Sequence, residues 1–109
     1  MATITRNVTQ ADKLLLDIKA ALDAYEADHP NSEASLYRQN SGSIRIRVID
    51  DRFAGMSKAD RHDDVWGYLS QRLPEDTLQE ISILIPLPQK ELSSSFINLE
   101  FNDPTPSRL

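Results

Sequence analysis

The chain has 109 residues, of which 39% are hydrophobic and 27% charged, and its formal net charge is −5. These values are typical of one globular domain and exclude an intrinsically disordered chain. The acidic balance argues against a general nucleic-acid binder, and the absence of cysteine excludes disulfides, thiolate metal sites and cysteine nucleophiles.

The sequence leads us to expect neither a secretory signal nor a membrane helix. Residues 1–10 lack the apolar core of a secretory signal, and no segment approaches the ~20 apolar residues that a membrane helix needs. We therefore expect a cytoplasmic protein whose residues 1–109 form a single domain, with residues 1–8 and 103–109 flexible.

The first predicted element is a helix that begins after Thr9 and ends near Asp28 or His29. Thr9 can cap this helix and Pro30 stops it. Its apolar side chains recur at helical spacing, namely Leu14, Leu15, Ile18, Leu22 and Tyr25. We expect His29 to be solvated at the C-terminus of the helix, where it interacts favourably with the helix dipole.

Two strands are predicted next, over residues 33–39 and 44–49, joined by a turn that contains Gly42. In the second strand apolar residues alternate with Arg45 and Arg47, so the two arginines share one face. Together with basic residues at 52, 58 and 61 they form the only basic concentration in the chain. Such a stripe can steer phosphate or an acidic partner, or it can simply solubilise an exposed sheet face, which we favour over nucleic-acid binding.

After a loop over residues 51–56, Ser57 can cap a second helix with Asp60 in its first turn. The apolar stripe of this helix consists of Val65, Trp66, Leu69 and Leu73, with Trp66 as the expected core anchor. A third strand follows over residues 81–85. A strand–helix–strand unit of this length predicts parallel strands and a right-handed crossover.

Residues 92–101 fit a helix or a strand, and Pro88 favours a short helix. The predicted order is therefore helix, strand, strand, helix, strand, helix. This order predicts an α+β domain with a three-stranded mixed sheet and its helices on one face.

Residues 44–73 resemble the BolA family. The shared features are an alternating strand that runs into Asp51-Arg52-Phe53-Ala54-Gly55, and Arg61-His62 at the start of an amphipathic helix. The order of the flanking elements is similar, so the resemblance covers most of residues 10–106. It implies a fold like that of type II KH domains. Members of this family pair with monothiol glutaredoxins around a shared [2Fe–2S] cluster, and some bind DNA as transcriptional regulators.

Two positions depart from the family pattern. Ile85 stands where the family has a histidine that ligates the cluster. The hairpin loop, which usually supplies the other ligand, reads Gln39-Asn40-Ser41-Gly42. Because alkyl, amide and hydroxyl groups do not ligate cluster iron, we carry over the fold and the binding surface but expect no cofactor and no metal.

The candidate binding residues are Arg45, Arg47, Arg52, Phe53, Gly55, Arg61 and His62. His62 can act as a metal ligand or a general base, or it can hold the preceding loop at the start of the helix, which we favour. No catalytic motif and no glycine-rich phosphate loop accompanies it. We therefore expect a non-catalytic adaptor that binds a protein partner through the Asp51–His62 surface. The alternative is a KH-like nucleic-acid-binding or transcriptional regulatory domain, and a glutaredoxin partner in iron–sulfur handling is less favoured.

Overall fold

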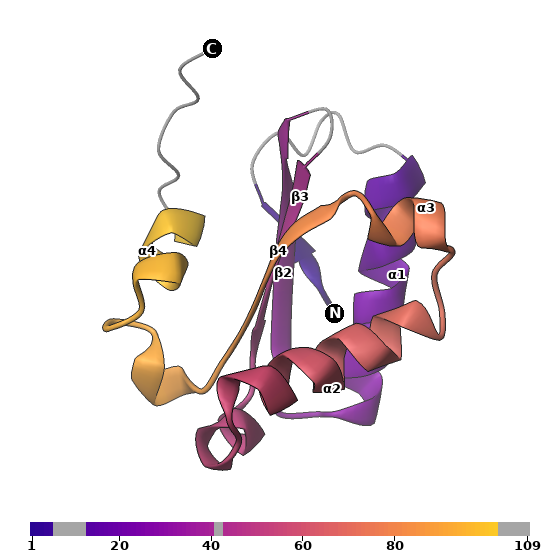
Figure 1. Cartoon of the computed structure of the whole chain (residues 1–109). Coiled ribbons are helices and arrows are strands. Elements are labelled where there is room, and N and C mark those ends of the chain that lie inside the picture. The colour runs from indigo at the N-terminus through magenta and orange to yellow at the C-terminus, as the bar shows by residue number, and fades with distance from the viewer. Residues whose placement is uncertain (6–12, 41–42, 103–109) are drawn as a thin grey trace.

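The computed structural model describes residues 1–5, 13–40 and 43–102 of the chain (Figure 1). Its sheet has four strands in the order β1-β2-β3-β4, which are β1 (Thr3–Ile4), β2 (Glu33–Asn40), β3 (Ser43–Ile49) and β4 (Ile81–Leu87). β1 runs parallel to β2, β2 antiparallel to β3, and β3 parallel to β4. The α+β class, the hairpin and the parallel pair are confirmed.

The sheet has one strand more than predicted. Residues 3–4 lie within a segment expected to be flexible, yet they pair with Ser35 and Leu36 of β2. The buried side chain of Ala2 helps to hold them there. Residues 6–8 and 103–109, the cap at Thr9 and the turn at Ser41-Gly42 lie outside the described residues.

The helical segments are α1 (Lys13–Asp28), η2 (Asp51–Gly55), α2 (Lys58–Ser70), α3 (Glu75–Leu78), η3 (Gln89–Glu91) and α4 (Phe96–Asn102), of which η2 and η3 are 3₁₀ turns. The predicted cap of α2 is confirmed, because the Ser57 hydroxyl accepts a hydrogen bond from the backbone N–H of Asp60 at 3.1 Å. The end of α1 and the helical character of the tail are also confirmed. The short helix α3 was not predicted.

Helices cover both faces of the sheet. α1, α2 and α3 lie on one face and α4 lies on the other (Figure 1). The main core on the first face includes Tyr25 of α1, Phe53 of η2 and three buried residues of β3, Ile44, Ile46 and Val48. A smaller cluster on the second face consists of Tyr37, Ile85, Leu87 and Phe101. The prediction of helices on one face is therefore wrong, because the apolar side chains on the second face of β2 and β4 are covered by α4.

Within the described ranges, no helix has the length and apolar character that crossing a membrane would require.

Candidate functional site

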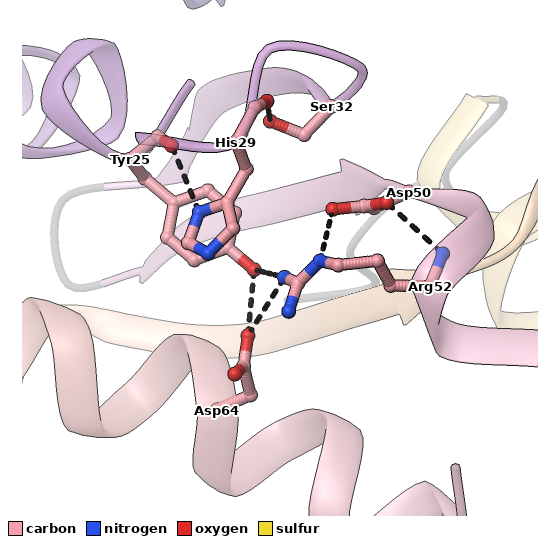
Figure 2. Close-up of polar contacts among 6 residues, drawn as sticks. All are labelled: Tyr25, His29, Ser32, Asp50, Arg52 and Asp64. Atoms are coloured by element: carbon pink, nitrogen blue, oxygen red, sulfur yellow. Dashed lines mark hydrogen bonds and ion pairs between the residues drawn. The ribbon is translucent and has the colours of Figure 1, made fainter. Parts of the chain in front are cut away.

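Arg52 lies at the centre of a polar network that joins α1, η2 and α2 (Figure 2). Its side chain donates to Asp50 Oδ2 at 2.8 Å, to the Tyr25 hydroxyl at 2.7 Å and to Asp64 Oδ2 at 3.2 Å. The Tyr25 hydroxyl in turn donates to Asp64 Oδ2 at 2.7 Å. These contacts fix the start of α2 against α1.

The charges of this network are mutually stabilised. Burial raises the pKa of the Tyr25 hydroxyl, and its hydrogen bond to Asp64 raises it further. Partial desolvation lowers the pKa of Arg52, but hydrogen bonds to Asp50 and Asp64 outweigh it and raise the pKa above the ordinary value. The Arg52 guanidinium is therefore a positive charge that already has two carboxylate partners.

Arg61 holds the first turn of α2 to its surroundings. It is only 6% exposed, and its Nε donates to the carbonyl oxygen of Met56 at 3.1 Å. Its two terminal nitrogens each donate to one oxygen of Glu91, both at 2.9 Å. These hydrogen bonds raise the pKa of Arg61 and lower that of Glu91. Arg61 thus holds the preceding loop, which is the role favoured for His62 on sequence grounds.

His62 itself is exposed, and its ring stacks on Trp66 with ring centroids 5.8 Å apart. Trp66 is half-buried and lines a shallow hollow of about 580 Å³ with Ile81 at its edge, so its prediction as a core anchor is wrong. The physical reason is its place on α2: it follows the buried Val65 by about 100° of helical rotation and so lies at the margin of the apolar stripe.

Arg45 and Arg47 lie on the second face of the sheet, beneath α4. Arg47 donates to the side-chain oxygens of Asn98 at 2.8 Å and Asn102 at 2.7 Å, and desolvation lowers its pKa. The Arg45 side chain is 14% exposed and forms an ion pair with Glu100 at 3.5 Å. The prediction that these arginines line an exposed sheet face is therefore wrong, because α4 covers them.

The other two candidate residues lie in η2. Phe53 is fully buried in the main core, so it supports the turn from beneath. Gly55 is exposed, and a Cβ there would meet nothing within 4 Å. Of the seven candidate residues, the structure thus brings Arg52, Phe53, Gly55, Arg61 and His62 to the start of α2, and places Arg45 and Arg47 elsewhere.

A groove of about 370 Å³ lies between the start of α2, β4 and the segment that follows η3. We call it the α2–β4 groove, and its lining residues are Lys58, Arg61, His62, Leu84, Ile85, Pro86, Leu87, Glu91, Ser94 and Ser95. Its volume is within the range of ligand pockets, roughly 300–1,000 Å³. Sequence reasoning singled out Arg61, His62 and Ile85 and included Lys58 in the basic stripe, but it did not bring these residues together with Leu84, Pro86, Leu87 and Glu91 in one groove. The two prolines at 86 and 88 are a signal that could have marked β4 as an accessible edge strand.

The groove has an apolar floor and a polar rim that includes one exposed cation. The floor is formed by residues 84–87 of β4, and the exposed side chains of Lys58 and His62 lie at the rim. Glu91 is neutralised by Arg61. Lys58, in contrast, forms no ion pair or hydrogen bond with any residue that the structure describes.

The two serine hydroxyls of the groove are engaged in local hydrogen bonds. Ser94 Oγ donates to the Glu91 carbonyl oxygen at 3.3 Å, and Ser95 Oγ accepts from the Asn98 N–H at 3.2 Å, so both hydroxyls serve the local backbone. In the described part of the chain, no three His, Asp or Glu side chains gather closely enough to hold a metal ion. With Ile85 at the expected ligand position and a single imidazole, the lining residues do not fit an iron–sulfur cluster.

Comparison with known proteins gives no relative: the chain matches no protein-family model, no curated protein and no solved structure. The function is therefore inferred from the site itself.

Proposed function

We propose that the protein is a non-catalytic, BolA-like adaptor that binds a protein partner through the α2–β4 groove. The observation that carries this proposal is the juxtaposition of the apolar floor at residues 84–87 with the exposed cation Lys58 and the imidazole of His62 at the rim. In protein interfaces the fully buried core is more apolar than the rest of the surface, while charges at the rim guide association and fix the register.

The position of the groove agrees with the BolA resemblance. The segment from Asp51 to His62, which carries the resemblance, forms η2 and the first turn of α2 and so borders the groove. The Arg52 network and the Arg61–Glu91 pair hold this segment in place. A rigid border favours binding because little conformational entropy is lost when a partner docks.

The nucleic-acid alternative has less support, because each arginine of the predicted basic stripe already has a partner within the chain. Arg52 and Arg61 bind carboxylates, Arg45 pairs with Glu100, and Arg47 binds two amides. These guanidinium groups would have to leave their partners before they could bind phosphates. The glutaredoxin alternative is weaker still, since the groove offers no second cluster ligand beside His62.

Affinity capture from a cell extract tests the proposal when it compares two charge-matched variants. Arg52 and Arg61 are unsuitable targets, because their replacement would disturb the fold around α2. Lys58→Glu changes an exposed residue in the first turn of α2, where a carboxylate is favourable to the helix dipole. Lys13→Glu makes the same change in net charge at an exposed position in α1.

We expect one or more proteins to be captured by the wild type and by Lys13→Glu, and to be lost with Lys58→Glu. If Lys58→Glu captures the same proteins in the same yield, or if the wild type captures nothing specific, the groove is not the binding site.

A further inference from the structure

β4 has one open edge. It lies at the end of the strand order and pairs only with β3 among the described strands. The backbone N–H of Asp50 donates to the carbonyl oxygen of Leu87 at 3.0 Å, so the backbone groups of Leu87 point toward β3. Because this direction alternates along a strand, those of Ile85 also point toward β3, and those of Leu84 and Pro86 point away.

Along residues 84–87, the outward side of β4 therefore presents three backbone groups: the N–H and C=O of Leu84 and the C=O of Pro86. None of them is paired with another backbone group in the residues that the structure describes. Pro86 is tolerated because its missing N–H would face outward in any case. Unpaired edges of this kind are templates for an additional strand.

The open edge coincides with the α2–β4 groove. Both Leu84 and Pro86 line the groove, so a chain that pairs with the edge would lie in it. The second hollow, beside Trp66, lies near Ile81 at the other end of β4. His62 lines the groove, Trp66 lines the second hollow, and their rings stack on each other on α2. A chain that runs along β4 from Pro86 toward Ile81 would therefore pass from the groove to the second hollow.

We propose that the partner binds as an added β-strand on the outward edge of β4, and that this strand carries aliphatic and acidic side chains. The aliphatic groups match the apolar floor at residues 84–87, and the carboxylates match Lys58. Charge complementarity supports this choice: Glu91 is the one carboxylate among the residues that line the groove, and it is already paired with Arg61, so the exposed ammonium group of Lys58 remains for a partner's carboxylate. This inference rests on the proposed function and deepens it.

The probe for the test is the blocked hexapeptide acetyl-Val-Glu-Val-Glu-Val-Glu-amide, which is extended, acidic and β-prone. Nuclear magnetic resonance follows backbone amide exchange in β4 of the full chain. Without peptide, we expect the Leu84 amide to exchange rapidly, and those of Ile85 and Leu87 to exchange slowly. With peptide at about ten times its dissociation constant, exchange at Leu84 should slow about tenfold, since only the free fraction exchanges.

Two methylated peptides separate strand addition from binding by side chains alone. In an extended chain all Val N–H groups point to one side and all Glu N–H groups to the other. Methylation of the Val nitrogens or of the Glu nitrogens should therefore weaken binding unequally. We expect one peptide to bind about tenfold more weakly, because it loses two backbone hydrogen bonds, and the other to bind nearly as well as the parent.

Lys58→Glu should weaken binding of the parent peptide by about fivefold, and Lys13→Glu should leave it unchanged. No saturable binding up to about 10⁻³ M, an unaltered Leu84 amide, or equal losses with both methylated peptides would overturn strand addition. If any of these occurs while capture from extracts still depends on Lys58, the groove remains the binding site and only the strand mode is wrong. Failure of both experiments overturns both proposals.

Discussion

Replacing Tyr25 by Phe removes one hydroxyl from the network that fixes α2 against α1. That hydroxyl donates to Asp64 at 2.7 Å and accepts from Arg52 at 2.7 Å, and the tyrosine is fully buried (Figure 2). The remaining ring fills the same space, so the change tests hydrogen bonding rather than packing. Asp64 and Arg52 still contact each other at 3.2 Å in its absence.

The expected loss follows from the partners of the hydroxyl. Hydrogen bonds to charged groups contribute about 1.5–3 kcal/mol each. The side chains of Asp64 and Arg52 are 28% and 41% exposed, so water can replace part of the lost interaction. We therefore expect a loss of about 2 kcal/mol in the free energy of unfolding. In a domain of this size, that loss lowers Tm by roughly 10 °C.

Urea denaturation and calorimetry measure this loss, and Tyr68→Phe is the matched control. The Tyr68 hydroxyl donates to Asp28, whose side chain is 59% exposed, so its removal should change the free energy of unfolding by less than about 0.5 kcal/mol. If the two variants lose equal stability, or if Tyr25→Phe loses none, the network does not hold α2 in the way we describe.

Tyr25→Phe should also change how the free energy of unfolding depends on pH in alkaline solution. Burial raises the pKa of the Tyr25 hydroxyl in the folded state, whereas in the unfolded chain it ionises near pH 10. Wild-type stability should therefore fall as the pH rises above about 10, because only the unfolded state gains from ionisation. In Tyr25→Phe, the part of this loss of stability that comes from ionisation of Tyr25 should be absent.

Three further predictions test other parts of the structure. Glu91, whose pKa Arg61 lowers, should stabilise the fold above about pH 4.3, near which a glutamate ionises in the unfolded chain. The difference in free energy of unfolding between wild type and Glu91→Gln, measured by urea denaturation, should therefore narrow as the pH falls below that value; a difference that stays constant with pH contradicts the ion pair. A double-mutant cycle of Arg47→Ala and Asn98→Ala should show a coupling of about 1 kcal/mol in the free energy of unfolding. A control cycle of Arg47→Ala with Asn31→Ala, at an exposed position, should show none. Zero coupling between Arg47 and Asn98 would mean that α4 does not dock on β3. A gel-shift assay at about 50 mM salt should show no complex with single-stranded DNA at micromolar protein, and a complex that weakens steeply with salt would restore the nucleic-acid alternative.

The elements that the sequence predicted are those with local signals. The alternation of Ile44, Ile46 and Val48 predicts a half-buried strand, and Ser57 followed by Asp60 predicts a helix cap. The parallel pairing of β3 and β4 follows from the length of the intervening helix. The strand and the cap depend on residues that are neighbours in the chain, and the parallel pairing depends on the length of one connecting segment.

The features that the sequence did not predict depend on distant contacts. β1 has two residues, too few for any periodicity, and exists through its pairing with β2. α4 covers the second face of the sheet because Phe101 packs against Tyr37, and this contact in turn buries Arg45 and Arg47. An alternating strand has the same sequence pattern whether its arginines are exposed or buried, so only the position of α4 shows that Arg45 and Arg47 are covered.

The role of Arg61 shows the same limit at the site. Its identity at the start of α2 could be predicted, but its partner Glu91 lies 30 residues away. In the sequence alone, where the contact with Glu91 is not visible, His62 attracts more attention than Arg61 as a functional residue. The structure reverses their roles, because Arg61 is buried and structural while His62 is exposed at the rim of the groove.

Site-specific photo-crosslinking in cells tests most directly whether the α2–β4 groove contacts a protein. p-Benzoylphenylalanine in place of His62 puts the reactive group at the rim of the groove, and the same group in place of Leu16, which is 49% exposed on α1, gives a matched control. We predict a crosslinked product of discrete mass from position 62 and none from position 16. Products from position 16 alone, or the same products from both positions, would contradict the assignment of the groove as the contact surface.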